Sequence, residues 1–188
     1  MSDSGVKLYK SDMDNLITML ANKLNKLDKN NTYKFYIVGG AALASYYGLR
    51  EFSRDIDASC IGNISNVEKD IEEIASEIGI LPGWLNFDYE KSESYTPKIV
   101  DNSILYKVIE NCEFHVASPQ LLLCMKLISF RGRPGKFDRE DAYKLVEYMR
   151  QEGYKVGMQD VIDFFDTLYK PTPELGYGAM TFLMDLGR

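Results

Sequence analysis

Two aspartates one residue apart, Asp55 and Asp57 in "RDIDAS", could do chemistry together. Alternate side chains of a β-strand point to one face, so a strand over residues 54–61 predicts both carboxylates on the same face. Such close carboxylates repel each other unless a cation lies between them. Because Mg²⁺ takes one or two carboxylates and completes its shell with water and substrate phosphates, the pair predicts a Mg²⁺ site. The alternative is a structural ion pair between Arg54 and one of the aspartates.

A double glycine, Gly39-Gly40, precedes the aspartates and lies between an apolar strand (34–38) and an expected helix (39–48). Glycines at such a position let backbone N–H groups approach a phosphate. Alone, a double glycine is commonly a tight turn, and a lone Asp-x-Asp is commonly a solvated edge. Their succession within one strand-helix-strand unit predicts a combined phosphate and metal site.

The succession "IVGGAAL…SRDIDAS" resembles the signature of the DNA polymerase β-type nucleotidyltransferase superfamily. It is most similar to the small bacterial stand-alone nucleotidyltransferases, including those related to toxin–antitoxin and abortive-infection modules. A weaker similarity extends to "SPQLLLCMKLISFRGRPGKFDREDAYKL". The matching segments, residues 35–59 and 118–145, cover roughly a third of the chain.

The resemblance implies Mg²⁺- or Mn²⁺-dependent transfer of a nucleoside monophosphate from a nucleoside triphosphate to a hydroxyl. In that reading Gly39 and Gly40 cradle the triphosphate, and Asp55 and Asp57 bind the metal ions. Lys126 and Arg131 neutralise phosphate charge. Arg133 and Lys136 are further cation candidates. Asp138 and Asp141 would orient these cations or cap a helix.

The family usually supplies a third carboxylate from a late strand, and this chain departs from that pattern. In "CEFHVAS", period two places Glu113, His115 and Ala117 on one face. The third carboxylate is therefore either shifted to Glu113 or replaced by His115, which serves as a base near neutral pH but is a poor Mg²⁺ ligand. The departure keeps a second function open, a catalytically inactive protein of this fold that binds nucleotide or, like an antitoxin, a protein partner.

The composition limits the partners. With 22 basic and 28 acidic residues, a formal net charge of -6 disfavours bulk DNA or anionic membrane. A protein partner, an RNA end or a small molecule remains as the acceptor. Three cysteines without paired spacing, no membrane-length apolar run and a polar N-terminus favour the cytoplasm. These cysteines are Cys60, Cys112 and Cys124.

The predicted fold class is α/β, a small mixed sheet flanked by helices with a helical C-terminal part, as in the nucleotidyltransferase fold. One domain over residues 1–188 is expected, with the sheet core at about 30–118 and helices packed on it at 119–188. Two to four short strands are expected between residues 87 and 117. Expected helix N-caps are Ser11, Ser65 with Glu68 in a capping box, and Ser118 followed by Pro119. Other expected helices span residues 136–153, 157–169 and 173–188.

Overall fold

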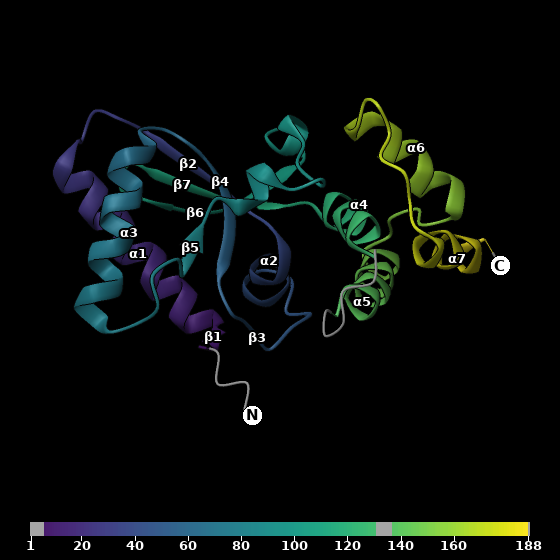
Figure 1. The fold of residues 1–188 in the computed structure, drawn as a ribbon, viewed down its shortest axis with the longest axis horizontal. Helices are drawn as coiled ribbons and strands as arrows, with labels where there is room; N and C mark the ends of the chain where they lie inside the picture. The colour runs from purple at the N-terminus through teal and green to yellow at the C-terminus, as the bar shows by residue number, and fades with distance from the viewer. Residues whose placement is uncertain (1–5, 131–136, 188) are drawn as a thin grey trace. The chain divides into compact units, whose positions relative to one another are not determined.

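The computed structural model describes residues 6–130 and 137–187, and the chain divides into two compact units. The sheet unit holds residues 6–91 and 103–117, and the helical unit holds residues 92–102 and the described residues from 118 onwards. The predicted α/β class, a mixed sheet with helices and a helical C-terminal part, is confirmed (Figure 1).

The main sheet has five strands in the order β5-β4-β2-β7-β6. Strand β2 runs antiparallel to β4 and parallel to β7, so the segment ending in the double glycine is central. Strand β6 pairs antiparallel with β7, and β5 pairs parallel with β4. The strands span Tyr33–Ile37 (β2), Ile56–Ile61 (β4), Leu85–Asn86 (β5), Ser103–Ile109 (β6) and Cys112–Ala117 (β7).

The two faces of the sheet differ in chemistry because side chains alternate along each strand. One face carries buried apolar groups, among them the stacked rings of Phe35 and Phe114, whose centroids lie 4.9 Å apart. Helices α1 (Lys10–Leu27) and α3 (Ile64–Ile78) pack on each other along this unit (Figure 1). The opposite face, called the polar face below, carries Lys34, Tyr36, Asp57, Ser59, Glu113 and His115.

Two of the three predicted N-caps are wrong by two residues. Helix α1 begins at Lys10, because the Tyr9 backbone N–H donates to the Asp12 carboxylate at 2.9 Å. Helix α3 begins at Ile64, where the side chain of Asn63 accepts from the Asn66 N–H at 3.4 Å. Asparagine caps as well as serine does, and here it stands two residues after the end of β4. The predicted capping box of Ser65 and Glu68 therefore lies inside the helix.

A two-stranded sheet between β1 (Leu8–Tyr9) and β3 (Phe52–Ser53) was not predicted from the sequence. Strands of two residues are too short to show a periodicity in the sequence, so this pair can be recognised only in the folded chain. The pairing ties the start of the described chain to the connection between α2 (Gly39–Ser45) and β4. It therefore helps to hold that connection in place.

The helical unit begins with α4 (Pro119–Ser129), for which the predicted cap is confirmed. The Ser118 hydroxyl accepts from the Leu121 N–H at 3.2 Å, and Pro119 occupies the first turn. Helices α5 (Asp138–Gln151), α6 (Met158–Leu168) and α7 (Tyr177–Leu186) follow. Of the expected segment 87–117, β6 and β7 are strands, while Asp88–Lys91 (η1) and Pro97–Ile99 (η2) form 3₁₀ turns.

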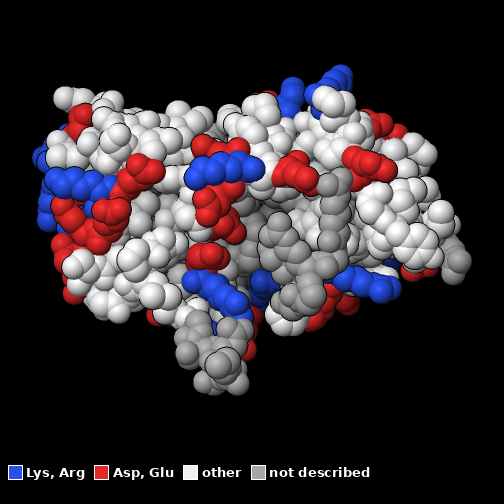
Figure 2. Space-filling view, in the orientation of Figure 1, with Lys and Arg blue, Asp and Glu red and all other residues white. Residues whose placement is uncertain are grey.

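Charges of both signs are interspersed on the surface. At the left of Figure 2, basic and acidic side chains lie next to each other. Within the sheet unit, Lys23 Nζ lies 3.1 Å from Glu73 and 2.7 Å from Glu77. Such exposed pairs contribute little stability. Within residues 6–130 and 137–187, no helix has both the length and the apolar content needed to cross a membrane.

A buried carboxylate in α3 destabilises the fold. Asp70 is only 6% exposed, and its Oδ2 has no hydrogen-bond partner among the described residues. Burial, and then the nearby Glu73, raise the pKa of the Asp70 carboxyl. Because the unfolded chain ionises this group more readily, the penalty is present above its unfolded pKa and disappears as the pH falls below it.

We therefore expect Asp70→Ala to raise the free energy of unfolding by about 1 kcal/mol at pH 7. The gain should shrink towards pH 4, as measured by urea unfolding at both pH values. Glu68→Ala, an exposed acid on the same helix, controls for helix propensity and should change stability by less than about 0.5 kcal/mol. A loss of stability in Asp70→Ala, or an equal gain at both pH values, would contradict this account.

Candidate functional site

The double glycine lies directly against Asp57. The Val38 N–H donates to the Asp57 backbone carbonyl at 2.9 Å, which brings the end of β2 beside β4. Gly39 follows with φ of +63°, and a Cβ atom built there would lie 3.3 Å from Asp57 Oδ2. Only glycine adopts this backbone conformation readily. The backbone at Gly39 is therefore packed closely against the Asp57 carboxylate.

Gly40 faces two side chains that the sequence did not single out. A Cβ atom at Gly40 would lie 2.8 Å from Arg50 Nη1 and 2.9 Å from Ser53 Oγ. Ser53 is 6% exposed and Arg50 is half-buried. Ser53 begins the segment "SRDIDAS" but was given no role there, and Arg50 lies outside it, so only the return of the α2–β4 connection over Gly40 reveals their position. The glycine pair thus has a carboxylate beside one residue and a guanidinium and a hydroxyl beside the next.

Asp55 and Asp57 differ in their secondary structure. Strand β4 begins at Ile56, so Asp57 lies on the strand while Asp55 lies in the bend before it. The alternation that predicted a shared face therefore applies to Asp57 but does not by itself orient Asp55. Both are half-buried, and Asn86 of β5 is the register partner of Asp57.

The sheet register separates the candidates for a third carboxylate from Asp57. Residues that are register partners across neighbouring strands form a row. His115 is in one row with Tyr36 and Ser59, and Glu113 is in another row with Lys34 and Ile61. These rows are the first and second beyond the row of Asp57, and successive rows are about 7 Å apart along the strands. Continuing the register by one residue places Ala117 of β7 in the row of Asp57.

Glu113 and His115 belong to a cluster of their own on the polar face. The Glu113 carboxylate lies 3.1 Å from His115 Nε2 and 3.0 Å from Lys34 Nζ. The His115 ring stacks on Tyr36 with centroids 5.0 Å apart. Hydrogen bonds from Lys34 and then from His115 lower the pKa of the Glu113 carboxyl. The carboxylate is therefore stabilised by two local donors.

Another carboxylate, missed in the sequence, approaches β4 from the η1 turn. Glu90 Oε1 accepts from Ser59 Oγ at 2.6 Å, and the Cys60 N–H lies 3.4 Å from the same oxygen. Ser59 is two residues beyond Asp57 on the same face. The turn-rich sequence around Glu90 has no periodicity that could have predicted this contact.

The predicted phosphate cations lie in the helical unit or outside the described residues. Lys126 is 8% exposed, and its ammonium lies 2.8 Å from Asp138 Oδ1 and 2.7 Å from Asp141 Oδ2. Two carboxylates therefore already contact this ammonium, and the contact joins α4 to α5. Arg131, like the further candidates Arg133 and Lys136, falls outside the described residues.

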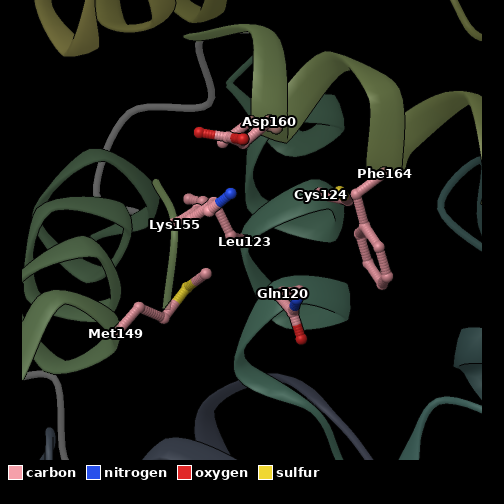
Figure 3. Close-up of a pocket in the computed structure, with 8 residues that line it drawn as sticks. Gln120, Leu123, Cys124, Met149, Lys155, Asp160 and Phe164 are labelled. Atoms are coloured by element: carbon pink, nitrogen blue, oxygen red, sulfur yellow. The ribbon is translucent and has the colours of Figure 1, made fainter. Parts of the chain in front are cut away.

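The helical unit contains a small cavity between α4, α5 and α6. Figure 3 shows Lys155 and Asp160 on one side of it and Gln120 on the other. The cavity measures about 20 Å³, which suits a single water molecule. It is therefore too small for a nucleoside.

The three cysteines are free and buried. Burial raises the pKa of the Cys60 and Cys112 thiols to about 12, and it also raises the pKa of the Cys124 thiol, which lines the cavity. The thiols are therefore protonated at neutral pH and behave as small apolar groups.

The residues around Gly39 fit a cation that arrives with its own phosphate ligands. In the part of the chain that the structure describes, no group of three or more histidines, cysteines or acids gathers to hold a metal ion. Mg²⁺ needs only one or two carboxylates when phosphates and water fill its other positions, and Asp55 and Asp57 provide oxygens of that kind. Comparisons with protein-family models, with curated proteins and with solved structures gave no match.

Proposed function

We propose that the protein binds a nucleoside triphosphate with Mg²⁺ at Gly39, Gly40, Asp55 and Asp57, and transfers the nucleoside monophosphate to a hydroxyl. The observation that carries the proposal is the close approach of the Gly39 backbone to Asp57 Oδ2, where a Cβ atom would lie 3.3 Å away. Because Gly39 carries no side chain, a phosphate held at its backbone would lie near the Asp57 carboxylate, and a Mg²⁺ ion would link the two. The resemblance of this segment to the polymerase β-type signature supports the same reading.

In the proposed reaction, the acceptor oxygen forms a bond to the α-phosphorus while the bond from that phosphorus to the bridging oxygen breaks. Pyrophosphate leaves and the hydroxyl proton is released. Bound Mg²⁺ would supply charge stabilisation for the phosphates. The protein's own contribution is to hold the Asp57 carboxylate beside Gly39, with Asp55 as the second proposed metal ligand.

The acceptor we propose is a protein partner, an RNA end or a small molecule, and the compartment is the cytoplasm. The acidic composition supports this choice over bulk DNA or a membrane surface. The similarity to nucleotidyltransferases related to toxin–antitoxin modules favours a protein acceptor or partner.

The test is calorimetric titration of ATP, GTP, CTP and UTP, each with and without Mg²⁺. We expect at least one triphosphate to bind in a Mg²⁺-dependent manner. Asp57→Ala should weaken that binding tenfold or more, which corresponds to about 1.4 kcal/mol. Glu113→Ala removes an equal charge from the same face and should leave the affinity within about twofold, because the register places it two rows away. If no triphosphate binds the wild-type protein, the proposed function is wrong.

A second candidate function is nucleotide binding without transfer. The specific observation in its favour is Ala117, which occupies the β7 position in the row of Asp57. Incubation of an α-³²P-labelled triphosphate with candidate RNA and protein acceptors separates the two functions. Labelled acceptor supports transfer, whereas Mg²⁺-dependent binding with no labelled product supports the inactive, antitoxin-like form.

A further inference from the structure

A magnesium triphosphate beside Asp55 and Asp57 needs a nearby protein cation. The nucleotide brings a net negative charge, and two carboxylates in a partly buried site would repel it unless a positive side chain offsets them. Lys126, which the resemblance suggests for this task, already contacts Asp138 and Asp141 in the helical unit. We therefore expect a phosphate-binding cation among the residues of the sheet unit.

The fold brings the cation of Arg50 to the glycine pair. Its Nη1 lies so close to Gly40 that a Cβ atom there would be 2.8 Å away. The same Cβ would lie 2.9 Å from the hydroxyl of Ser53, a side chain that is 6% exposed. The Arg50 guanidinium and the buried Ser53 hydroxyl thus both lie close to Gly40, the residue after Gly39.

The backbone around Arg50 is held from both sides. Leu49 donates its N–H to the Leu43 carbonyl at 2.9 Å, which fixes the chain after α2. Three residues after Arg50, Ser53 pairs with Leu8 in the two-stranded sheet. The guanidinium is therefore carried by a segment with two fixed ends.

We propose that Arg50 is the triphosphate-binding cation of this site, with the Ser53 hydroxyl beside it as a second donor. This inference rests on the proposed function. A guanidinium presents paired N–H donors that match two phosphate oxygens, which an ammonium cannot do. Arg50 sets affinity for the polyphosphate and makes no contact with the base.

The experiment compares Mg²⁺-dependent binding of the nucleotide preferred by the wild-type protein, as its triphosphate and its monophosphate, in three proteins. Arg50→Gln should lose tenfold or more in triphosphate affinity and much less in monophosphate affinity, so that the ratio of the two affinities falls. Arg150→Gln, at an exposed arginine in the last turn of α5, removes the same charge elsewhere and should bind like wild type. Thermal unfolding of each variant checks that it is folded.

The outcomes separate this inference from the function on which it rests. If Asp57→Ala abolishes triphosphate binding while Arg50→Gln binds like wild type, the role of Arg50 is wrong and the proposed site stands. If Arg50→Gln loses triphosphate and monophosphate affinity equally, Arg50 supports the site's structure and the inference is also wrong. If Arg50→Gln does not fold, Arg50→Lys decides: a several-fold loss confined to the triphosphate supports the inference, and wild-type affinity overturns it. A wild-type protein that binds no triphosphate overturns both.

Discussion

Lys126→Met is expected to lower the free energy of unfolding by about 3–5 kcal/mol, the usual cost of removing one partner from a buried ion pair. In the wild-type protein, the Lys126 ammonium contacts the carboxylates of Asp138 and Asp141, whose side chains are 12% and 1% exposed. Without the ammonium, these two carboxylates lose a cation that water cannot replace. The measurement is urea unfolding at pH 7, followed by circular dichroism.

Two further variants test the cause of that loss. Lys144→Met breaks an ion pair of the same length, 2.7 Å to Glu140, but with side chains 41% and 56% exposed. It should cost less than about 1 kcal/mol, because water screens exposed pairs. Adding Asp138→Asn and Asp141→Asn to Lys126→Met should recover part of the stability, because the unpaired charge is then gone. Equal losses in the Lys126 and Lys144 variants would show that burial of the charges is not the cause.

Gly62→Ala is expected to cost about 2–4 kcal/mol, the sum of backbone strain and overpacking. Gly62 follows β4 with φ of +151°, and its Cβ atom would lie 2.6 Å from Tyr33 Cδ1. Tyr33 is fully buried on β2, so its ring must shift within a packed core to make room. The midpoint of urea unfolding at constant slope measures the loss.

Gly48→Ala is the matched control for the steric part of that cost. Gly48 also has positive φ, +66°, but nothing lies within 4 Å of its Cβ position. It should therefore lose only the backbone term, about 1 kcal/mol. Replacing Tyr33 by Leu in the Gly62→Ala background should recover part of the loss, and a double-mutant cycle measures the coupling. Similar losses for the two alanine variants would show that contact with Tyr33 contributes nothing.

The sequence by itself determined the features that depend on local pattern. A short apolar run predicted β2, strands were expected where β4 and β7 lie, and serine before proline predicted the start of α4. Local pattern also predicted that the double glycine lies between a strand and a helix. The candidate residues Gly39 and Asp57 follow from that succession, because strand-helix-strand units bring the ends of neighbouring strands together.

Only the tertiary structure decided which side chains meet. The antiparallel pairing of β2 with β4 brings Gly39 to Asp57, and the return of residues 46–55 brings Arg50 and Ser53 to Gly40. The parallel register of β2 and β7 places Glu113 and His115 away from Asp57, although the period of two had put them on the expected face. Register depends on pairing between distant segments, and a period of two is unchanged by a shift of two residues. Spacing within one segment therefore predicts the face of a side chain but not its neighbours.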